Sequence, residues 1–243
     1  MTAPPARAQV LADLLELVLA VRPRERAVVG IDGPDGVGKS TLSAELRALA
    51  PLVSQRELVG VGLGGFHHPR AHRYAHGRDA ESYYRHAFDL ATFRRRVVDP
   101  FRAGREIVTA VHDVTTDRPL HLDPVEPAED AVLLVDGVFL QRAELAGCFD
   151  AVLLATAPPE VTVPRGNARF GRPREEDDPD HPANARYVGA QRIYAYELRR
   201  DGVLPTWILE CTDLDRPVLL EPDPELGATT RGLVTGPDAD ATG

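Results

Sequence analysis

Short apolar runs alternate with stretches of helical periodicity along most of this chain. The apolar runs are rich in β-branched residues and bounded by turn residues, a pattern that predicts buried strands. They occupy Ala27–Ile31, Leu58–Leu63, Ile107–Val111, Ala131–Val135, Ala151–Ala155 and Trp207–Glu210. Apolar residues at helical spacing predict helices over residues 6–21, 42–49, 81–86, 90–98, 161–170 and 184–198. Strands that alternate with helices require crossover connections, which predicts a mostly parallel sheet covered by helices on both faces.

Length and composition indicate one globular α/β domain. The chain has 243 residues, of which 43% are hydrophobic and 27% charged, as in soluble enzymes. Its formal net charge of −9 would repel nucleic acids and anionic membranes, so neither is expected as a partner. No apolar run approaches the roughly 20 residues that span a bilayer. Asp13 and Glu16 interrupt the apolar residues near the start, which argues against a signal peptide there. A cytoplasmic protein is therefore expected.

Two segments are predicted to lack regular structure. Residues 172–182 combine prolines with acidic residues and are expected to form an exposed, mobile loop. Residues 218–243 are rich in proline, glycine and acidic residues, which predicts a disordered tail. The folded domain is therefore expected at residues 1–217.

A glycine-rich loop follows the first predicted strand. Gly33-x-x-x-x-Gly38-Lys39-Ser40 is a complete P-loop signature, and it lies between a predicted strand and a predicted helix, as a P-loop does. The glycines allow the backbone to wrap a phosphate, with N–H groups and the positive end of the helix dipole directed at the anion. Lys39 is the only lysine among the 28 basic residues, which indicates that a compact ammonium group is needed there. The pattern predicts binding of a nucleoside triphosphate.

Three acidic residues lie where they could serve this loop. Asp136 follows an apolar run, like the acid of a Walker B motif, and would hold Mg²⁺ together with the Ser40 hydroxyl. The alternative role for Asp136 is to cap a helix near Gln141. Asp32 and Asp35 flank the loop and could contact a metal-bound water or a substrate hydroxyl, or they could only shape the turn.

Motifs spread over residues 25–217 resemble those of one enzyme family. They are the loop Gly33–Thr41, the runs Gly65–Tyr74 and Tyr83–Asp89, the segment Asp136–Leu140 and Thr212-Asp213-Leu214-Asp215. In order and spacing they resemble the uridine kinase and phosphoribulokinase-like P-loop kinases, in particular an actinobacterial uridine kinase-like group. The resemblance implies the three-layer αβα sandwich of P-loop NTPases, with a helical lid at about residues 163–183. It also implies ATP or GTP as phosphoryl donor, Mg²⁺, and an acceptor hydroxyl on a nucleoside or similar small molecule, and it leaves a homo-oligomer open.

The same resemblance assigns roles to individual residues. The lid arginines Arg165 and Arg169, four positions apart and followed by Arg172, would close over the transferred phosphate. The expected catalytic set consists of these two with Lys39, Asp136 and Asp32. The nucleotide would be bound by Gly33, Asp35, Gly36, Val37, Gly38, Lys39, Ser40, Thr41 and Asp213. The acceptor would be bound by Phe66, His67, Arg73, Tyr74, Tyr84, His112 and Asp117.

Two places depart from the family pattern. Family members usually carry an acid two positions before Phe66, as catalytic base or metal-side carboxylate, and here that position is Gly64. Loss of such a base typically costs about 10²–10⁴-fold in rate. His112 and Asp117 stand where uridine kinases present a tyrosine and a histidine to the pyrimidine, which changes the hydrogen-bond pattern offered to a base.

The sequence supports three functional hypotheses. The first is a kinase that transfers a phosphoryl group from ATP or GTP to a hydroxyl of a nucleoside or nucleoside-like metabolite. The second is a diverged nucleotide-binding protein with weak or no kinase activity, because Gly64 replaces the usual acid. The third is an NTPase coupled to a protein partner, for which the sequence offers no recognisable partner-binding element.

Overall fold

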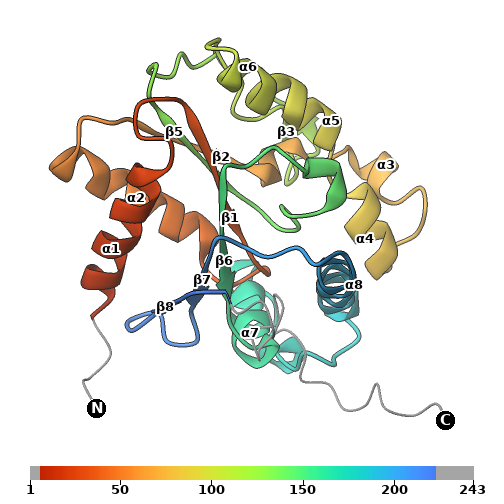
Figure 1. Cartoon of the computed structure of the whole chain (residues 1–243). Coiled ribbons are helices and arrows are strands. Elements are labelled where there is room, and N and C mark those ends of the chain that lie inside the picture. The colour runs from red at the N-terminus through yellow and green to blue at the C-terminus, as the bar shows by residue number, and fades with distance from the viewer. Residues whose placement is uncertain (1–5, 223–243) are drawn as a thin grey trace.

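A six-stranded sheet runs through the centre of the molecule, whose computed structural model describes residues 6–222 (Figure 1). Its strand order is β2-β5-β1-β6-β7-β8. The bounds are β1 Ala27–Asp32, β2 Leu58–Gly62, β5 Val132–Asp136, β6 Ala151–Thr156, β7 Trp207–Glu210 and β8 Val218–Leu220. Neighbouring strands are parallel except β8, which pairs with β7 in the antiparallel sense. The predicted, mostly parallel sheet is confirmed.

Two helices near the start of the chain cover one face of the sheet. They are α1, Arg7–Ala20, and α2, Lys39–Val53, drawn in red and orange in Figure 1. Leu14 and Leu46, each 0% exposed, pack in one core cluster with Ile31 of β1 and other strand residues. The apolar stripes of both helices face this layer, so burial of apolar surface positions the helix that opens at Lys39.

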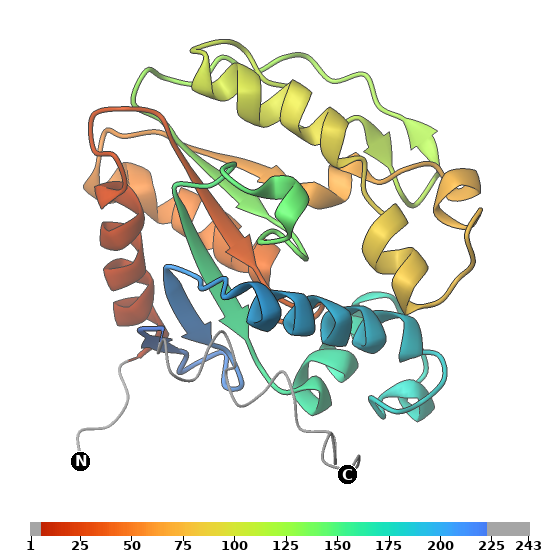
Figure 2. The same ribbon diagram turned by 45° about the vertical axis from the view of Figure 1, so that its right-hand side comes forward.

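The opposite face is covered by helices from the middle and the end of the described chain. They are α4, Ala80–His86, α5, Leu90–Phe93, α6, Asp99–Arg102, and α8, Ala185–Asp201. Figure 2 shows these helices on the side of the sheet away from α1. Phe93, Phe101 and Tyr194 share a core cluster with Val28 and Leu133, whose side chains leave the sheet on this face. The architecture is the expected three-layer αβα sandwich.

The predicted strand at Ile107–Val111 is wrong. Ile107 is buried and makes a single isolated bridge to Val125, while the N–H of Val111 donates to the carbonyl of Gly65. The segment therefore satisfies its backbone groups with loops outside the central sheet. A separate two-stranded ribbon follows it, made of β3, His112–Asp113, and β4, Arg118–Pro119.

The helix predicted at residues 90–98 is longer than expected. It continues through a π-helical turn, Arg94–Val98, into α6. Pro100 has no N–H, so the carbonyl of Arg96 four residues earlier has no donor within the helix. The N–H of Val108 donates to that carbonyl over 3.1 Å instead. A partner from outside the helix thus allows it to pass through the proline.

The two segments expected to lack regular structure, residues 172–182 and 218–243, both differ from that expectation in part. Val218–Leu220 forms β8, so the predicted disordered tail is wrong for these residues, because the sheet edge of β7 pairs with them. Residues 223–243 lie outside the described part of the chain. In the expected loop at 172–182, the guanidinium of Arg172 donates to Asn167 and to Asn184, both buried, over 3.1 and 3.3 Å. The loop is therefore fastened to α7, Pro159–Arg169, and to the start of α8.

Within residues 6–222, no helix combines the length and the apolar character needed to cross a bilayer.

Candidate functional site

The P-loop, residues 33–41, joins the carboxyl end of β1 to the start of α2. Gly38 caps α2 in the left-handed region, with φ of 101°, and Lys39 is the first helical residue. Gly36, with φ of 80°, lies so close to α7 that a Cβ atom there would be 2.0 Å from the carbonyl oxygen of Thr162. Only glycine fits this contact. The loop is therefore held between the sheet and α7, with the N–H groups of the helix start at the carboxyl edge of the strands.

Lys39 is buried within this loop. Its side chain is 8% exposed, and its ammonium donates a hydrogen bond of 2.7 Å to the carbonyl of Pro34. Burial lowers the pKa of Lys39, an effect that the positive charge of Arg169 increases. Three carboxylates oppose the shift in pKa, those of Asp35, Asp32 and Asp136. Lys39 thus places a desolvated positive charge in the loop, where its attraction to a phosphate is strong.

Ser40 and Asp136 meet at the sheet edge, as the sequence predicts. The Ser40 hydroxyl donates a hydrogen bond of 2.6 Å to Oδ2 of Asp136, the last residue of β5. No helix near Gln141 starts from Asp136, because the next regular element is the short 3₁₀ turn Ala143–Leu145, capped by Arg142. The alternative capping role is therefore not supported.

The pair of oxygens fits Mg²⁺ in a nucleotide complex. Mg²⁺ usually takes one or two protein oxygens and completes its shell with phosphates and water. Among residues 6–222, no group of three or more His, Cys, Asp or Glu side chains is arranged to hold a metal without such help. Ser40 and Asp136 would therefore hold the ion only together with a bound triphosphate.

Asp32 is not placed as a base. It is 0% exposed, and its carboxylate accepts hydrogen bonds from the N–H of Gly33, from the amide of Gln141 and from the phenol of Tyr194. Burial raises the pKa of Asp32, and these hydrogen bonds oppose that shift. Both oxygens are engaged by the protein. Asp32 therefore anchors the start of the P-loop, and the predicted contact with substrate is not supported.

Two residues predicted to bind the acceptor belong to the core. Phe66 and Tyr84 are both 0% exposed. The ring of Phe66 packs edge-on against Phe93 at 5.4 Å between centroids, and the ring of Tyr84 packs edge-on against Phe139 at 5.0 Å. The Tyr84 hydroxyl donates to Glu197 of α8. The predicted role is wrong for both, because a side chain without exposed surface cannot contact an acceptor.

Tyr83, the neighbour of Tyr84 in the chain, makes a hydrogen bond with the P-loop. Its hydroxyl donates a hydrogen bond of 3.2 Å to Asp35, the exposed carboxylate of the P-loop, and burial raises its pKa well above the usual value. Tyr83 is itself only 7% exposed and shares the core cluster of Tyr84, and its ring packs edge-on against Phe139 at 5.7 Å between centroids. The hydroxyl of Tyr83 is therefore the part of the side chain that reaches the P-loop.

Three other predicted acceptor residues come together around one carboxylate. Oδ1 of Asp117 accepts a hydrogen bond of 2.8 Å from the N–H of Arg70 and lies 3.1 Å from Nε2 of His112. The guanidinium of Arg73 lies 3.6 Å from the same oxygen. The backbone N–H of Arg70 is the main reason why the pKa of Asp117 is lowered. Arg73 and His112 are mostly buried, so they position Asp117 more than they offer free polar groups.

His67 lies between this cluster and the P-loop. Its Nδ1 is 2.7 Å from the carbonyl of Gly64, and its ring packs on Phe88 at 4.4 Å between centroids. Burial lowers the pKa of His67. The positive charge of Arg73 lowers it further, and the negative charge of Asp35 opposes the shift. A Cβ atom added at Gly64 would have no neighbour within 4 Å. The position of the missing acid is therefore open.

Tyr74, also predicted to bind the acceptor, lies among arginines. The guanidiniums of Arg73, Arg78 and Arg186 lie 5.4, 4.6 and 4.9 Å from the centre of its ring. Arg186, in the first turn of α8, also lies 5.2 Å from the ring centre of Tyr83. Sequence reasoning missed Arg186, since nothing local distinguishes it from other surface arginines.

The two predicted lid arginines do different things. The guanidinium of Arg165 donates to the carbonyls of Cys211 and Thr212, each over 2.8 Å, so it fixes the segment after β7. Arg169 lies over the ring of Phe170 at 5.8 Å and is near enough to Lys39 to lower its pKa. Of the two, only Arg169 has its guanidinium free of hydrogen bonds to the described residues.

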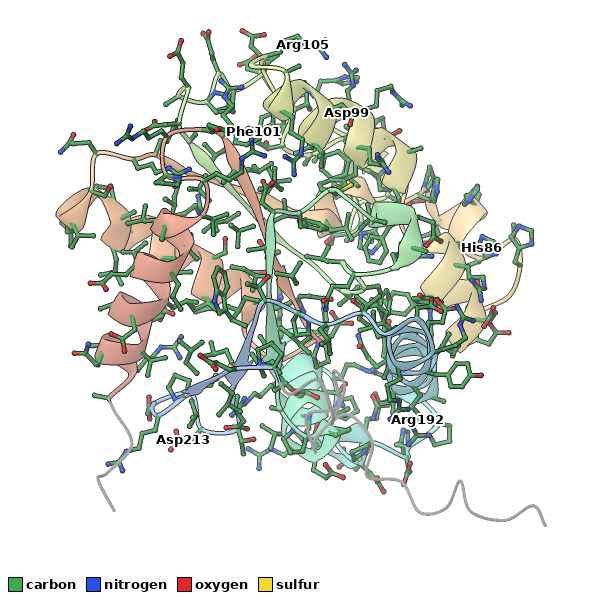
Figure 3. The ribbon with its side chains drawn as sticks, viewed as in Figure 1. His86, Asp99, Phe101, Arg105, Arg192 and Asp213 are labelled. Atoms are coloured by element: carbon green, nitrogen blue, oxygen red, sulfur yellow. The ribbon has the colours of Figure 1, made fainter. Side chains whose placement is uncertain are left out.

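The segment Thr212–Asp215 lies beside the P-loop. A Cβ atom at Gly38 would be 3.7 Å from a methyl group of Leu214, whose carbonyl accepts a hydrogen bond of 2.7 Å from Arg7. Asp213, labelled in Figure 3, is exposed and accepts from the N–H of Asp215 over 2.9 Å. The contact of Asp213 with the nucleotide stays a prediction.

The two remaining nucleotide-binding predictions fall within the loop and helix start. Val37 is 1% exposed and packs in the core, so it can offer only its main chain. Thr41 is exposed on the first turn of α2.

Comparison with known proteins identifies the fold. Neither the family models nor the sequences of curated proteins match the chain. Among solved structures, a possible uridine kinase from Bacillus stearothermophilus aligns with a TM-score of 0.61 at 22% identity, over 78% of this chain and 91% of that one. A "putative fructose transport system kinase" from Silicibacter sp. TM1040 aligns with a TM-score of 0.60 at 23% identity, over 74% and 94%. The chain therefore has the α/β fold of these P-loop kinases.

Proposed function

We propose that this protein is a phosphotransferase that moves the γ-phosphoryl group of ATP or GTP to a hydroxyl of a nucleoside-like small molecule. The observation that carries the proposal is the hydrogen bond of 2.6 Å between Ser40 and Asp136, beside the buried ammonium of Lys39. These groups meet at the carboxyl edge of the sheet, where ligands of open parallel sheets bind. The structural neighbours, described as kinases, support the same class of reaction.

The residues divide the work of binding the donor. The N–H groups of the loop and Lys39 bind the β- and γ-phosphates, and Ser40 and Asp136 hold the metal. Mg²⁺, when bound, would neutralise the negative charge that develops on the phosphate oxygens during transfer. Arg169 supplies a further positive charge near Lys39. We assign Asp213 and the main chain after β7 to the nucleoside of the donor, because a methyl group of the neighbouring Leu214 lies 3.7 Å from a Cβ position at Gly38.

We assign to Asp35 the proton of the acceptor. Asp35 is exposed, it belongs to the P-loop, its carboxylate accepts a hydrogen bond from Tyr83, and its charge acts on His67, one of the residues predicted to bind the acceptor. In the reaction, the acceptor oxygen forms a bond to the γ-phosphorus, and its proton passes to Asp35. The bond from that phosphorus to the bridging oxygen breaks, and the electron pair leaves with the nucleoside diphosphate.

A diverged nucleotide-binding protein is the second candidate, because Gly64 leaves the usual acid position open. The measurement that separates the candidates is release of ADP from ATP and Mg²⁺, with and without a panel of hydroxyl acceptors. Release that depends on an acceptor and disappears in Lys39→Ala supports the kinase. Triphosphate binding without turnover would support the diverged protein instead. Release that ignores every acceptor would indicate an NTPase coupled to another partner.

A further inference from the structure

The ring of Tyr74 stands at the centre of a cationic cluster. Arg73, Arg78 and Arg186 all place their guanidinium carbon within 5.4 Å of its centre. Arg73 comes from α3, Arg70–Arg73, and Arg186 from α8, so the tertiary fold brings the charges together. Three like charges at this distance repel one another, so their proximity calls for compensation by anions.

The protein supplies that compensation for one arginine only. Arg73 pairs with Asp117 and donates to the carbonyl of His68 over 2.8 Å. Arg78 and Arg186 make no ion pair and no side-chain hydrogen bond with any residue between positions 6 and 222; their contacts are with aromatic rings. The Nε atom of Arg186 is buried without an acceptor. A buried donor left without an acceptor is destabilising, so this position favours an anion.

The cluster faces the same part of the site as the P-loop carboxylate. Arg186 lies against Tyr74 and Tyr83, and the hydroxyl of Tyr83 donates to Asp35. The guanidinium carbon of Arg186 lies 4.9 and 5.2 Å from the centres of these two rings, and a guanidinium offers paired N–H groups that carboxylates and phosphates accept. The donor already has Lys39 and the loop N–H groups, so a second cationic position is available for the acceptor.

We propose that Arg186, together with Arg78, binds an anionic group of the acceptor, a carboxylate or a phosphate. The acceptor is then a hydroxyl compound that carries its own negative charge, in contrast to a neutral nucleoside. This inference rests on the proposed phosphotransferase function and narrows its substrate class. The hydroxyl that attacks the γ-phosphorus and the anionic group belong to one molecule, which spans from Asp35 to Arg186.

The test compares acceptors and matched variants. Neutral nucleosides and sugars form one panel, and nucleoside monophosphates, sugar phosphates and hydroxy acids form the other. Binding of each compound is measured in the presence of Mg²⁺ and a non-hydrolysable triphosphate, and ADP release is measured with ATP. The variants are Arg186→Gln, Arg78→Gln and, as control, Arg192→Gln. Arg192 lies on the same helix, is exposed, and is labelled in Figure 3.

We expect at least one anionic compound to bind and to be phosphorylated in preference to every neutral one. Arg186→Gln should weaken the binding of this anionic compound at least about tenfold, as expected when a charged hydrogen-bond donor is lost. Arg192→Gln should leave the binding of this compound unchanged. The affinity for triphosphate should stay unchanged in both. Turnover of neutral acceptors alone would overturn this inference and leave the kinase proposal standing. Binding of no anionic compound by the unaltered protein would also overturn it, as would a loss of triphosphate affinity in Arg186→Gln, which would place that arginine on the donor.

Discussion

The phenol of Tyr194 donates a hydrogen bond to the carboxylate of Asp32, across 162 positions of sequence. Both side chains are buried, and Tyr194 also accepts a hydrogen bond of 2.8 Å from the N–H of Gln141. The bond ties the middle of α8 to the last residue of β1, immediately before the P-loop. Because Arg186 lies on the same helix, the position of the cationic cluster relative to the P-loop depends on this contact.

Tyr194→Phe should destabilise the protein. The change removes one of the donors to a buried carboxylate and leaves the N–H of Gln141 without its acceptor, at a cost of about 1–3 kcal/mol. Urea unfolding measures this free energy. Tyr196→Phe is the control, because Tyr196 is 60% exposed on the same helix. Equal stability of the two variants would show that the buried bond contributes nothing.

Asp32 should give stability a dependence on pH. Burial raises the pKa of Asp32 above its ordinary value of 3.8, so the folded state holds this proton more tightly than the unfolded state. The contribution of Asp32 to stability is then complete below pH 3.8 and is lost as the pH rises through the folded-state pKa. The free energy of unfolding of Asp32→Asn, relative to the unaltered protein, should therefore increase with pH in that range.

Urea unfolding at a series of pH values checks this expectation, with Asp123→Asn as control because Asp123 is exposed. A relative stability of Asp32→Asn that fell with pH would reverse the sign and contradict a raised pKa.

Gly64→Asp should increase the rate of phosphoryl transfer, because it adds a carboxylate at the position where family members usually carry an acid and where Asp35 otherwise acts alone as the base. The new side chain meets no atom within 4 Å at its Cβ, so the fold should tolerate it. Restoring a positioned base is worth up to about 10²–10⁴-fold in rate. The turnover number for ADP release measures the effect, and Gly64→Asn is the control without a carboxylate. A gain that Asn reproduces would rule out base catalysis as its cause.

Arg165→Gln and Arg169→Gln should affect different kinetic parameters. Arg165 holds the carbonyls of Cys211 and Thr212, next to Asp213, so its loss should raise KM for the triphosphate with little change in kcat. Arg169 is free and near Lys39, so its loss should lower kcat. Steady-state kinetics at varied triphosphate distinguish the two. Identical effects of the two variants would show that both arginines act on the transferred phosphate.

The sequence predicted the P-loop and its partners because their geometry is local. A strand, a tight glycine loop and a helix start follow one another within residues 27–41, and Asp136 ends an apolar strand whose place in a parallel sheet follows from the alternating pattern. The hydrogen bond between Ser40 and Asp136 joins two positions that sequence reasoning had already paired.

Contacts between distant segments decided the rest. Which of Tyr83 and Tyr84 faces the P-loop depends on how α4 packs against the sheet, and the fate of Asp32 depends on Tyr194 arriving from α8. Arg186 gained its place beside Tyr74 in the same way. A local pattern specifies how the backbone can bend around an anion. Only packing determines which charged side chains lose water and which keep it, and this difference separates a structural residue from one that can bind a substrate.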